Sequence, residues 1–371
     1  MHLLDDQGRV FGIVNVIDLL AVLFALAVVV AGVALVFSGG SGGDPDLGTR
    51  YVTVDLGTQP DYVTERIDAG DAAAYETGNL TVTDVYATPA GGGGATVTIR
   101  ARVVGQRAAE SPDSAPLSVA GDALLLGREL PVETDEYRVS GTVTAVERGD
   151  DTLAVSPTPI LLTTTMPATR ASAIDRGDTY ATNGRALATV ESVTAYPVGN
   201  GSTRRVLLGL SLETISRSGG RHFGGQPVAL GRSLSIPFDD YDVRGEVTRL
   251  GRSTPPGEVS TTTVVLRLSN VAPERATNVH AGLTERVGDT RYAVVTDVRI
   301  APSEVVLTSQ DGNISLHDHP RNLDVTLTVD LRTRETGTGL TFHGEPLRLD
   351  ERILLVFDAL SVRGTPIEIR G

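Results

Sequence analysis

The segment Gly121-Asp-Ala-Leu-Leu-Leu-Gly127 recurs twice further along the chain, as Gly225-Gln-Pro-Val-Ala-Leu-Gly231 and as Gly344-Glu-Pro-Leu-Arg-Leu-Asp350. A further glycine stands fourteen residues after each closing residue, and these glycines are Gly141, Gly245 and Gly364. Several markers that keep one spacing are the signature of an internal repeat. The chain is therefore predicted to consist of three homologous modules.

A second set of markers gives the same three copies. An Ile or Val stands three residues before a glycine in Ile67 and Gly70, Ile174 and Gly177, and Val279 and Gly282. We predict modules at residues 50–153, 154–258 and 259–371, each long enough for its own core. All six glycines are predicted to lie at structural turns. At Gly141 and Gly245 we expect a bulge or a close strand approach that leaves no room for a side chain.

The alternation of apolar and polar residues predicts the fold of each module. Val97, Ile99, Ala101 and Val103 alternate with Thr and Arg residues that include Arg100, and residues 324–331 repeat the pattern. A period of two with one wet face is typical of antiparallel sheets. We predict a mainly β protein whose modules are antiparallel barrels or sandwiches. Each module is expected to carry one short helix, of about two turns, after Pro60, Pro167 or Pro273.

One aspartate in each module lies six residues before the second repeated glycine. These residues are Asp135, Asp239 and Asp358. They fall between the two closing strands of each module, where an aspartate side chain commonly accepts a hydrogen bond from a nearby backbone N–H. We predict that each one stabilises its own turn in this way.

The residues before the modules predict a membrane anchor. The 19 residues from Leu19 to Phe37 carry no charged or hydrogen-bonding side chain, and a helix of this length spans the hydrocarbon layer. A buried core helix would keep a polar stripe, and a signal peptide would have a shorter apolar segment behind a basic head. We predict a short tail at residues 1–16, a retained transmembrane helix at 17–37 and a Gly/Ser-rich tether at 38–49.

The shortness of the N-terminal tail favours a cytoplasmic N-terminus. The protein is therefore expected in the cell membrane, as a single-pass protein whose modules are extracellular. Three N-glycosylation sequons are candidates for modification on that side, and they begin at Asn79, Asn200 and Asn313.

Composition excludes several classes of function. The chain of 371 residues has no Cys, so disulfides, thiolate zinc sites and cysteine nucleophiles are excluded. All 32 basic residues are Arg, and the net charge is −14. Nucleic acid is not an expected partner, because phosphate binding needs a field of the opposite sign. An acidic surface without Lys is typical of proteins that work in high salt, where self-repulsion is screened.

Motifs for chemistry are few. The chain contains no G-x-S-x-G, H-E-x-x-H, Walker or Rossmann motif. The glycines at 91–94 are interpreted as a hairpin tip, the pair His317 and His319 as part of an exposed loop, and the acidic group Asp239, Asp240 and Asp242 as a turn with solvated neighbours, not as a Ca²⁺ site. We predict no enzymatic activity, no catalytic residue, no metal site and no cofactor.

A family resemblance supports the anchor. The head from Leu4 to Asp18, which runs directly into the apolar segment, resembles the start of the DUF4330 family of single-span membrane proteins. Segments of the closing module are also similar to that family, among them Gly339-Leu-Thr-Phe-His-Gly344 and Val362-Arg-Gly364-Thr. The family has no assigned function, so the resemblance implies a membrane-anchored protein and no site residues.

Two function hypotheses follow. The first is a membrane-anchored, non-enzymatic envelope protein that acts as a scaffold or interaction module, with unknown envelope partners. The alternative is a carrier of lipid or another hydrophobic ligand, because a single span followed by Ile67-Asp-Ala-Gly-Asp71 is loosely similar to the anchored barrels of MCE-type transport proteins.

Overall fold

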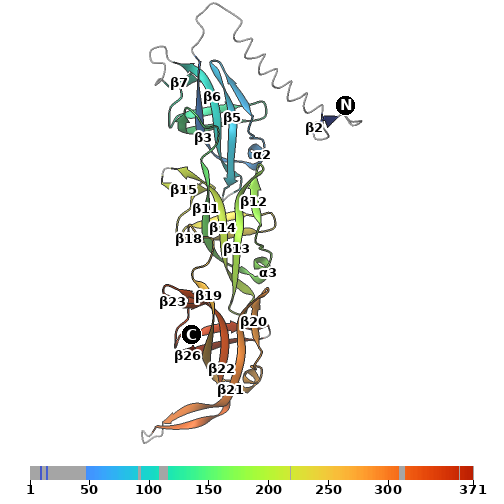
Figure 1. The fold of residues 1–371 in the computed structure, drawn as a ribbon, viewed down its shortest axis with the longest axis vertical. Coiled ribbons are helices and arrows are strands. Elements are labelled where there is room, and N and C mark those ends of the chain that lie inside the picture. The colour runs from blue at the N-terminus through green and yellow to red at the C-terminus, as the bar shows by residue number, and fades with distance from the viewer. Residues whose placement is uncertain are drawn as a thin grey trace, which may run out of the picture.

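The computed structural model describes residues 9–10, 14–15, 47–90, 93–107, 116–217, 219–308, 314–358 and 360–370. Three similar eight-stranded antiparallel sheets stack end to end into a rod (Figure 1). The predicted β class and the threefold repeat are confirmed. The predicted transmembrane helix lies outside the described residues, and no helix within them is long and apolar enough to cross a membrane.

The elements follow one order in each module. The N-terminal head contributes β1 (Arg9–Val10) and β2 (Val14–Asn15), which pair with each other. Module 1 contains β3 (Leu47–Gln59), α2 (Asp61–Thr64), β4 (Ala72–Tyr75), β5 (Gly78–Pro89), β6 (Ala95–Arg107), β7 (Leu117–Val119), β8 (Asp122–Ala123), β9 (Glu129–Glu133) and β10 (Arg138–Glu147). β3 thus begins inside the segment predicted as the tether.

Modules 2 and 3 repeat these elements. Module 2 contains β11 (Val155–Pro167), α3 (Ala168–Ala171), β12 (Thr179–Thr182), β13 (Arg185–Val198), β14 (Thr203–Arg217), β15 (Gly220–Phe223), β16 (Gln226–Pro227), β17 (Ser233–Pro237) and β18 (Asp242–Leu250). Module 3 contains β19 (Glu258–Val271), α4 (Pro273–Ala276), β20 (Thr284–Val287), β21 (Thr290–Thr308), β22 (Ile314–Thr336), β23 (Gly339–Phe342), β24 (Glu345–Pro346), β25 (Ile353–Val356) and β26 (Ser361–Arg370).

Each sheet curls into a barrel-like shape. In module 1 the strand order is β4-β5-β6-β3-β10-β9, so β4 and β9 are the two edges. The edges approach each other, because the Tyr75 hydroxyl on β4 donates a 2.5 Å hydrogen bond to the Pro131 carbonyl on β9. The sheet is therefore closed by side chains where the ladder of backbone hydrogen bonds ends.

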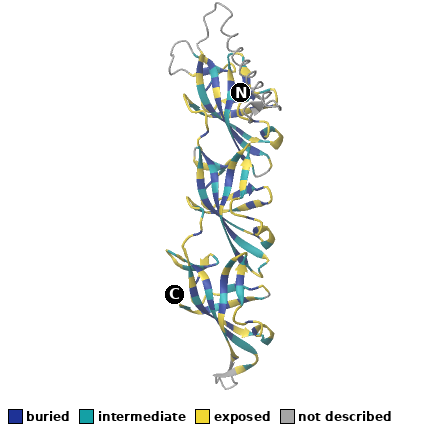
Figure 2. Cartoon of the chain, turned by 45° about the vertical axis from the view of Figure 1, so that its right-hand side comes forward, coloured by how far each residue is buried: buried dark blue, intermediate teal, exposed yellow. Residues whose placement is uncertain are grey.

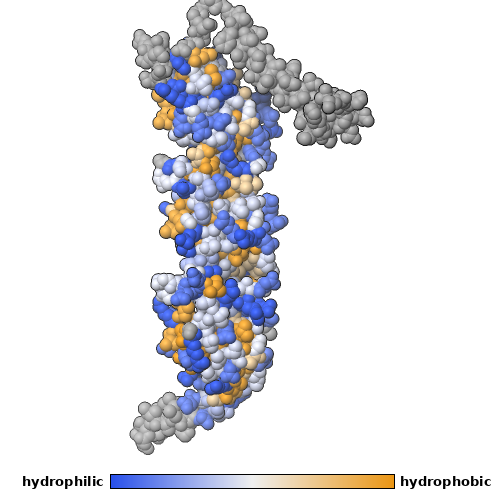
Figure 3. Space-filling view, viewed as in Figure 1, coloured by the Kyte–Doolittle hydropathy of each residue, from blue (hydrophilic) through white to orange (hydrophobic). Residues whose placement is uncertain are grey.

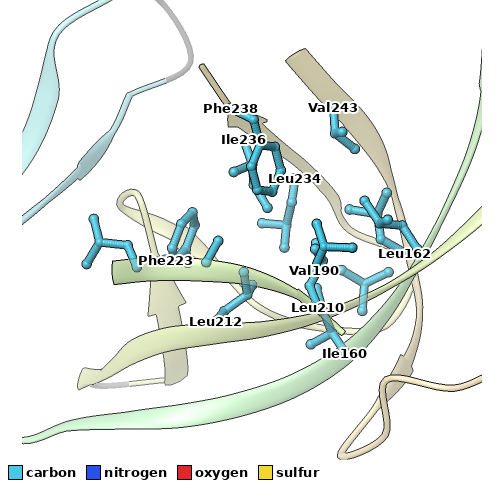
Figure 4. Packing of buried hydrophobic residues seen from close by; sticks show 14 of the residues in the cluster. Ile160, Leu162, Val190, Leu210, Leu212, Phe223, Leu234, Ile236, Phe238 and Val243 are labelled. Atoms are coloured by element: carbon cyan, nitrogen blue, oxygen red, sulfur yellow. The ribbon is translucent and has the colours of Figure 1, made fainter. Parts of the chain in front are cut away.

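The predicted alternation fills the barrel interiors. Val97, Ile99, Ala101 and Val103 are fully buried on β6, and Val325 to Leu331 show the same alternation on β22. Along many of the strands in Figure 2, buried residues accordingly alternate with intermediate or exposed ones. In module 2, Ile160, Leu210 and Ile236 come from different strands and converge in one core, shown in Figure 4.

Arg100 corrects one part of this prediction. It was expected on the wet face of β6, yet only 3% of its side chain is exposed. The outer face of the sheet is not in water at this point, because the chain that leaves β10 crosses over it. Arg100 donates hydrogen bonds to the carbonyls of Gly149 and Asp150 and pairs with Glu147.

The helices are shorter than predicted. Each of α2, α3 and α4 has four residues, about one turn instead of two. The apolar residues that follow, such as Ile67, belong instead to the turn that leads back into the sheet. Pro60 and Pro167 immediately precede their helices, and Pro273 is the first residue of α4.

The hairpin of β21 and β22 corrects a second prediction. The backbone at His317 and His319 was expected in an exposed loop, but both residues belong to β22. Pro302 pairs with Leu323, at the position where the corresponding hairpins of modules 1 and 2 approach their turns. Here the two strands continue, so that Glu304 pairs with Asp318 and Thr308 with Ile314. This extension forms the far end of the rod (Figure 1).

Candidate functional site

The turn after each helix is built on a glycine. Gly70, Gly177 and Gly282 have φ angles of 107°, 99° and 94°, a region that side chains other than hydrogen disfavour. Their N–H groups donate 2.8 Å hydrogen bonds to the carbonyls of Val82, Val190 and Val295. Each glycine therefore reverses the chain and pins it to the next long strand.

The second set of glycines lies where strands pack closely. A Cβ atom on Gly141 would lie 2.6 Å from the Asp55 carbonyl oxygen, and one on Gly245 would lie 2.7 Å from that of Thr163 and would overlap the Leu162 side chain. At Gly364 the nearest atom would be 3.0 Å away, on Leu266. The space is thus most restricted in modules 1 and 2.

The turns at Asp135, Asp239 and Asp358 are held differently from our prediction. In the described part of the chain, none of these three carboxylates accepts a hydrogen bond. The turn of module 1 is closed by a backbone bond from the Thr134 N–H to the Tyr137 carbonyl, and Thr134 Oγ1 also accepts from the Tyr137 N–H at 3.1 Å. The turns of modules 2 and 3 are closed by backbone bonds from Phe238 to Tyr241 and from Phe357 to Leu360. The three aspartates therefore extend toward solvent, where their charge stays hydrated.

In each of the first two barrels, an aspartate that we did not predict as a site residue binds a tyrosine. The aspartate lies just before the edge strand β4 or β12, and the tyrosine lies in the turn between the two closing strands. The Tyr137 hydroxyl donates to Asp71 Oδ2 at 2.6 Å, and the Tyr241 hydroxyl donates to Asp178 Oδ2. Both carboxylates also accept a 2.9 Å hydrogen bond from the backbone of Asp68 or Asp175. We call this pair the Asp–Tyr latch.

The latch perturbs the tyrosines and has an apolar counterpart in module 3. Burial, followed by the hydrogen bond to the aspartate, raises the pKa of Tyr137 and of Tyr241 well above the ordinary value. Module 3 carries Leu283 and Leu360 at these two places, and both pack against its core. The sequence could have revealed this pair, because the aspartate after the glycine and the tyrosine of the closing turn are both replaced by leucine in module 3.

The joint between modules 1 and 2 is held by charged and polar contacts. Asp84 of module 1 accepts a 2.8 Å hydrogen bond from the Leu153 N–H of the linker and forms an ion pair with Arg185 of module 2. Arg217 of module 2 binds Asp55 at 2.6 Å and also donates to Thr98. These contacts join different strands of the two barrels, β5 with β13 and β3 with β14, and therefore restrict the orientation of the joint.

An aromatic side chain also crosses this joint. Tyr86 of module 1 packs into the core of module 2, and its hydroxyl donates to the Glu213 carbonyl at 2.5 Å. Burial raises the pKa of Tyr86 above its ordinary value. The first joint is therefore partly a shared core.

The joint between modules 2 and 3 uses other positions of the repeat and contains more aromatic residues. Tyr196 of module 2 meets Tyr292 of module 3 edge-on, with ring centroids 5.3 Å apart, and lies 5.5 Å from the ring of His343. His343 forms a pair with the fully buried Glu285, whose other oxygen accepts from the Val356 N–H at 2.6 Å. Arg205 and Glu345 add an ion pair of 2.8 Å across the joint.

The linker from module 2 to module 3 is bound at the same strand position as the linker that leaves module 1, but the hydrogen bond runs in the opposite direction. Ser192, at the position of Asp84, donates to the Ser253 carbonyl. Gly209, at the position of Arg100, leaves room for that carbonyl, because a side chain there would overlap it. The two joints thus share a design in which the outer face of one barrel grips the linker to the next.

The grooves of the described surface are open and are lined by both polar and apolar side chains. One groove of about 700 Å³ lies between the hairpin tip of module 2 and the edge of module 3, and its walls carry polar residues such as Asn270 and Arg275 beside apolar ones such as Leu268, Val279 and Leu354. No group of three or more His, Cys, Asp or Glu side chains within the described ranges is arranged to hold a metal ion. His319 instead accepts hydrogen bonds from the backbone of Arg321 and Asn322.

The sequons have different settings. Asn79 is exposed on β5. Asn200 lies at the hairpin turn of module 2, where its Oδ1 accepts from the N–H and hydroxyl of Ser202. Asn313 lies outside the described residues.

Residues 1–92 match the family model "Domain of unknown function (DUF4330)", which covers the head and the beginning of module 1. The resemblance noted in the head is thereby confirmed. No curated protein and no solved structure matches the chain.

Proposed function

We propose that this protein, whose residues 1–92 match DUF4330, is a membrane-anchored scaffold of the cell envelope without enzymatic activity. In this proposal residues 17–37 hold the chain in the membrane, and the three modules form a spacer that presents surfaces to envelope partners outside the cell. The family match over residues 1–92 includes the head and the segment that we propose as the anchor.

The observation that carries the proposal is the pair of built joints. Flexible strings of domains have small, wet contacts between neighbours. Here ion pairs, linker clasps and buried aromatic residues hold each barrel to the next, as Arg217 with Asp55 and Tyr196 with Tyr292 illustrate. Because these contacts restrict bending at both joints, the three modules are suited to act as a spacer between two points.

The filled barrel interiors favour this function over the alternative of a lipid carrier. A carrier needs a continuous apolar groove or pore. The interiors here are occupied by side chains such as Ile160 and Leu210, which are fully buried. The 700 Å³ groove between modules 2 and 3 is not a continuous apolar surface, because Asn270, Arg275 and Asn322 are among the residues that line it.

Membrane retention and lipid content together test the proposal. We expect the full-length protein to remain with membranes through high-salt and carbonate washes, whereas a chain that starts at Leu47 should be soluble in strong salt. Recovery of the full-length protein in the soluble fraction would contradict the anchor. Mass spectrometry of the purified modules should find no lipid, and about one lipid per chain would support the carrier instead.

A further inference from the structure

Each module exposes a leucine at the same position of the repeated segment. Leu126, Leu230 and Leu349 have 66%, 62% and 53% of their surface exposed. Single exposed leucines are common and need no explanation. These three are different, because the same residue recurs at one structural position in every module.

The fold itself does not require these leucines. The apolar residue two positions earlier, which is Leu124, Val228 or Leu347, is the one that enters the core, since each is at least nine-tenths buried. That buried position varies between Leu and Val, whereas the exposed position is Leu in all three modules. Core packing therefore accounts for the first apolar position and leaves the second without a role.

The turns that carry the leucines are firmly placed. Gly127 and Gly231 follow the leucines of modules 1 and 2, and their N–H groups donate to the carbonyls of Val143 and Val247 on the last long strand. In module 3 the Asp350 N–H donates to the Pro366 carbonyl. Each leucine thus projects from a platform that is bonded to its barrel.

The three leucines lie on one side of the rod. The modules stack in nearly the same orientation, with β15, β18 and β23 on the left of Figure 1 and α2 and α3 on the right. Equivalent residues therefore face the same way. Figure 3 shows apolar patches at three levels along that left-hand side. We call this side, defined by Leu126, Leu230 and Leu349, the leucine edge.

We propose that the leucine edge is the contact surface for a second copy of this chain, aligned in parallel. A partner that engages all three sites must present groups with the same spacing, and a second copy does so by construction. In a twofold pair each leucine would meet its own counterpart, so the contact is self-complementary. The parallel direction rests on the proposed anchor, because two copies held in one membrane start from the same end.

Charge along the edge fits such a pair. The chain has a net charge of −14, which opposes association of copies elsewhere on the surface. Exposed residues of both signs lie in or near the segment of each leucine: Asp122 and Arg128, which pair with each other at 2.8 Å, Arg232 and Glu246, and Arg348 and Glu351. In a twofold arrangement the arginines of one copy can lie beside the carboxylates of the other. The contact area is small, so anchoring in one membrane, which raises the effective concentration, is expected to be needed for stable pairing.

Cysteine cross-linking of the full-length protein tests the proposal, because the natural chain has no Cys. With Leu230→Cys we expect oxidation or a short bis-maleimide to give a covalent dimer. The matched control is Thr169→Cys, which is exposed in the same module but lies in α3 on the opposite side. A dimer with Leu230→Cys and not with Thr169→Cys supports the leucine edge. Equal yields, or no dimer with either variant, overturn it.

Three further variants test whether the pairing is parallel and whether the leucines cause it. Mixed samples of differently tagged Leu126→Cys and Leu349→Cys chains should link only like to like, and mixed dimers would overturn the parallel arrangement. Adding Leu126→Asp and Leu349→Asp to Leu230→Cys should lower the dimer yield about tenfold, and an unchanged yield would also overturn the proposal. The wash experiment reports on the anchor separately, so failure of the anchor and failure of the edge can be told apart.

Discussion

Gly245 shows how a single atom limits this fold. A Cβ there would meet the Thr163 carbonyl and the Leu162 side chain, which belong to the neighbouring strand β11. We expect Gly245→Val to lower the free energy of unfolding of module 2 by about 1–3 kcal/mol. Thermal unfolding measures the change. Gly337→Ala is the control, because nothing lies within 4 Å of a Cβ at that position, and a loss of stability there equal to that of Gly245→Val would contradict the steric explanation.

The Asp–Tyr latch gives a second prediction at the scale of the residue. Tyr241→Phe leaves Asp178 with one fewer donor and should cost about 1–2 kcal/mol. The double variant Asp178→Leu with Tyr241→Leu copies the solution of module 3 and should recover part of that loss. A double-mutant cycle by chemical denaturation measures the coupling. Additive effects would show that the two side chains do not act as a pair.

At the scale of the element, the closing edge of the first barrel should make stability depend on high pH. Burial, followed by the charge of Glu133, raises the pKa of Tyr75 to about 12 from 10.0. Because the pKa of Tyr75 is higher in the folded state, the contribution of Tyr75 to the free energy of unfolding is complete below pH 10 and is lost as the pH rises toward 12. We expect the unfolding midpoint to fall across this range, and to fall less in Tyr75→Phe. An equal fall in both proteins would assign the effect to other tyrosines, such as Tyr86.

The strands were predictable from the sequence to different degrees. The alternation at Val97 to Val103 revealed a buried face because period two needs only local information. The burial of Arg100 could not be read in this way, since it depends on a linker that lies some fifty residues later in the chain. The helices were predicted too long for a related reason. Ile67 continues the apolar spacing of α2, yet it is fully buried in the turn beyond the helix.

The contacts that join the modules were not predictable from the sequence. Asp84, Ser192 and Gly209 are unremarkable residues in strands, and they acquire a role only when one barrel is placed on the next. The repeat spacing did reveal that there are three modules, since spacing survives even where side chains differ. The contacts between neighbouring modules depend on positions whose residues differ between the three copies.

At the scale of the whole molecule, the first joint should control the independence of the modules. Arg217→Ala with Arg185→Ala removes two ion pairs to module 1. We expect this variant to be cleaved faster by trypsin after Arg148, in the linker, while each barrel remains folded. The control is Arg138→Ala, whose ion pair with Glu133 is exposed and lies within one module. Equal cleavage rates in the two variants would contradict a stabilised joint.

The linker clasps have a mechanical consequence. Glu147, where the chain leaves module 1, pairs with Tyr51 near the start of the first strand of the same module. Tension applied along the rod from its N-terminal end therefore enters and leaves the first barrel at neighbouring points, and most of the strands of this barrel do not carry the load directly. The bonds stretched first are those of Arg100 to Asp150 and of Asp84 to Leu153. Under tension, we expect the linker to detach from the barrel and extend before any barrel unfolds, so that the rod lengthens slightly while its modules stay folded.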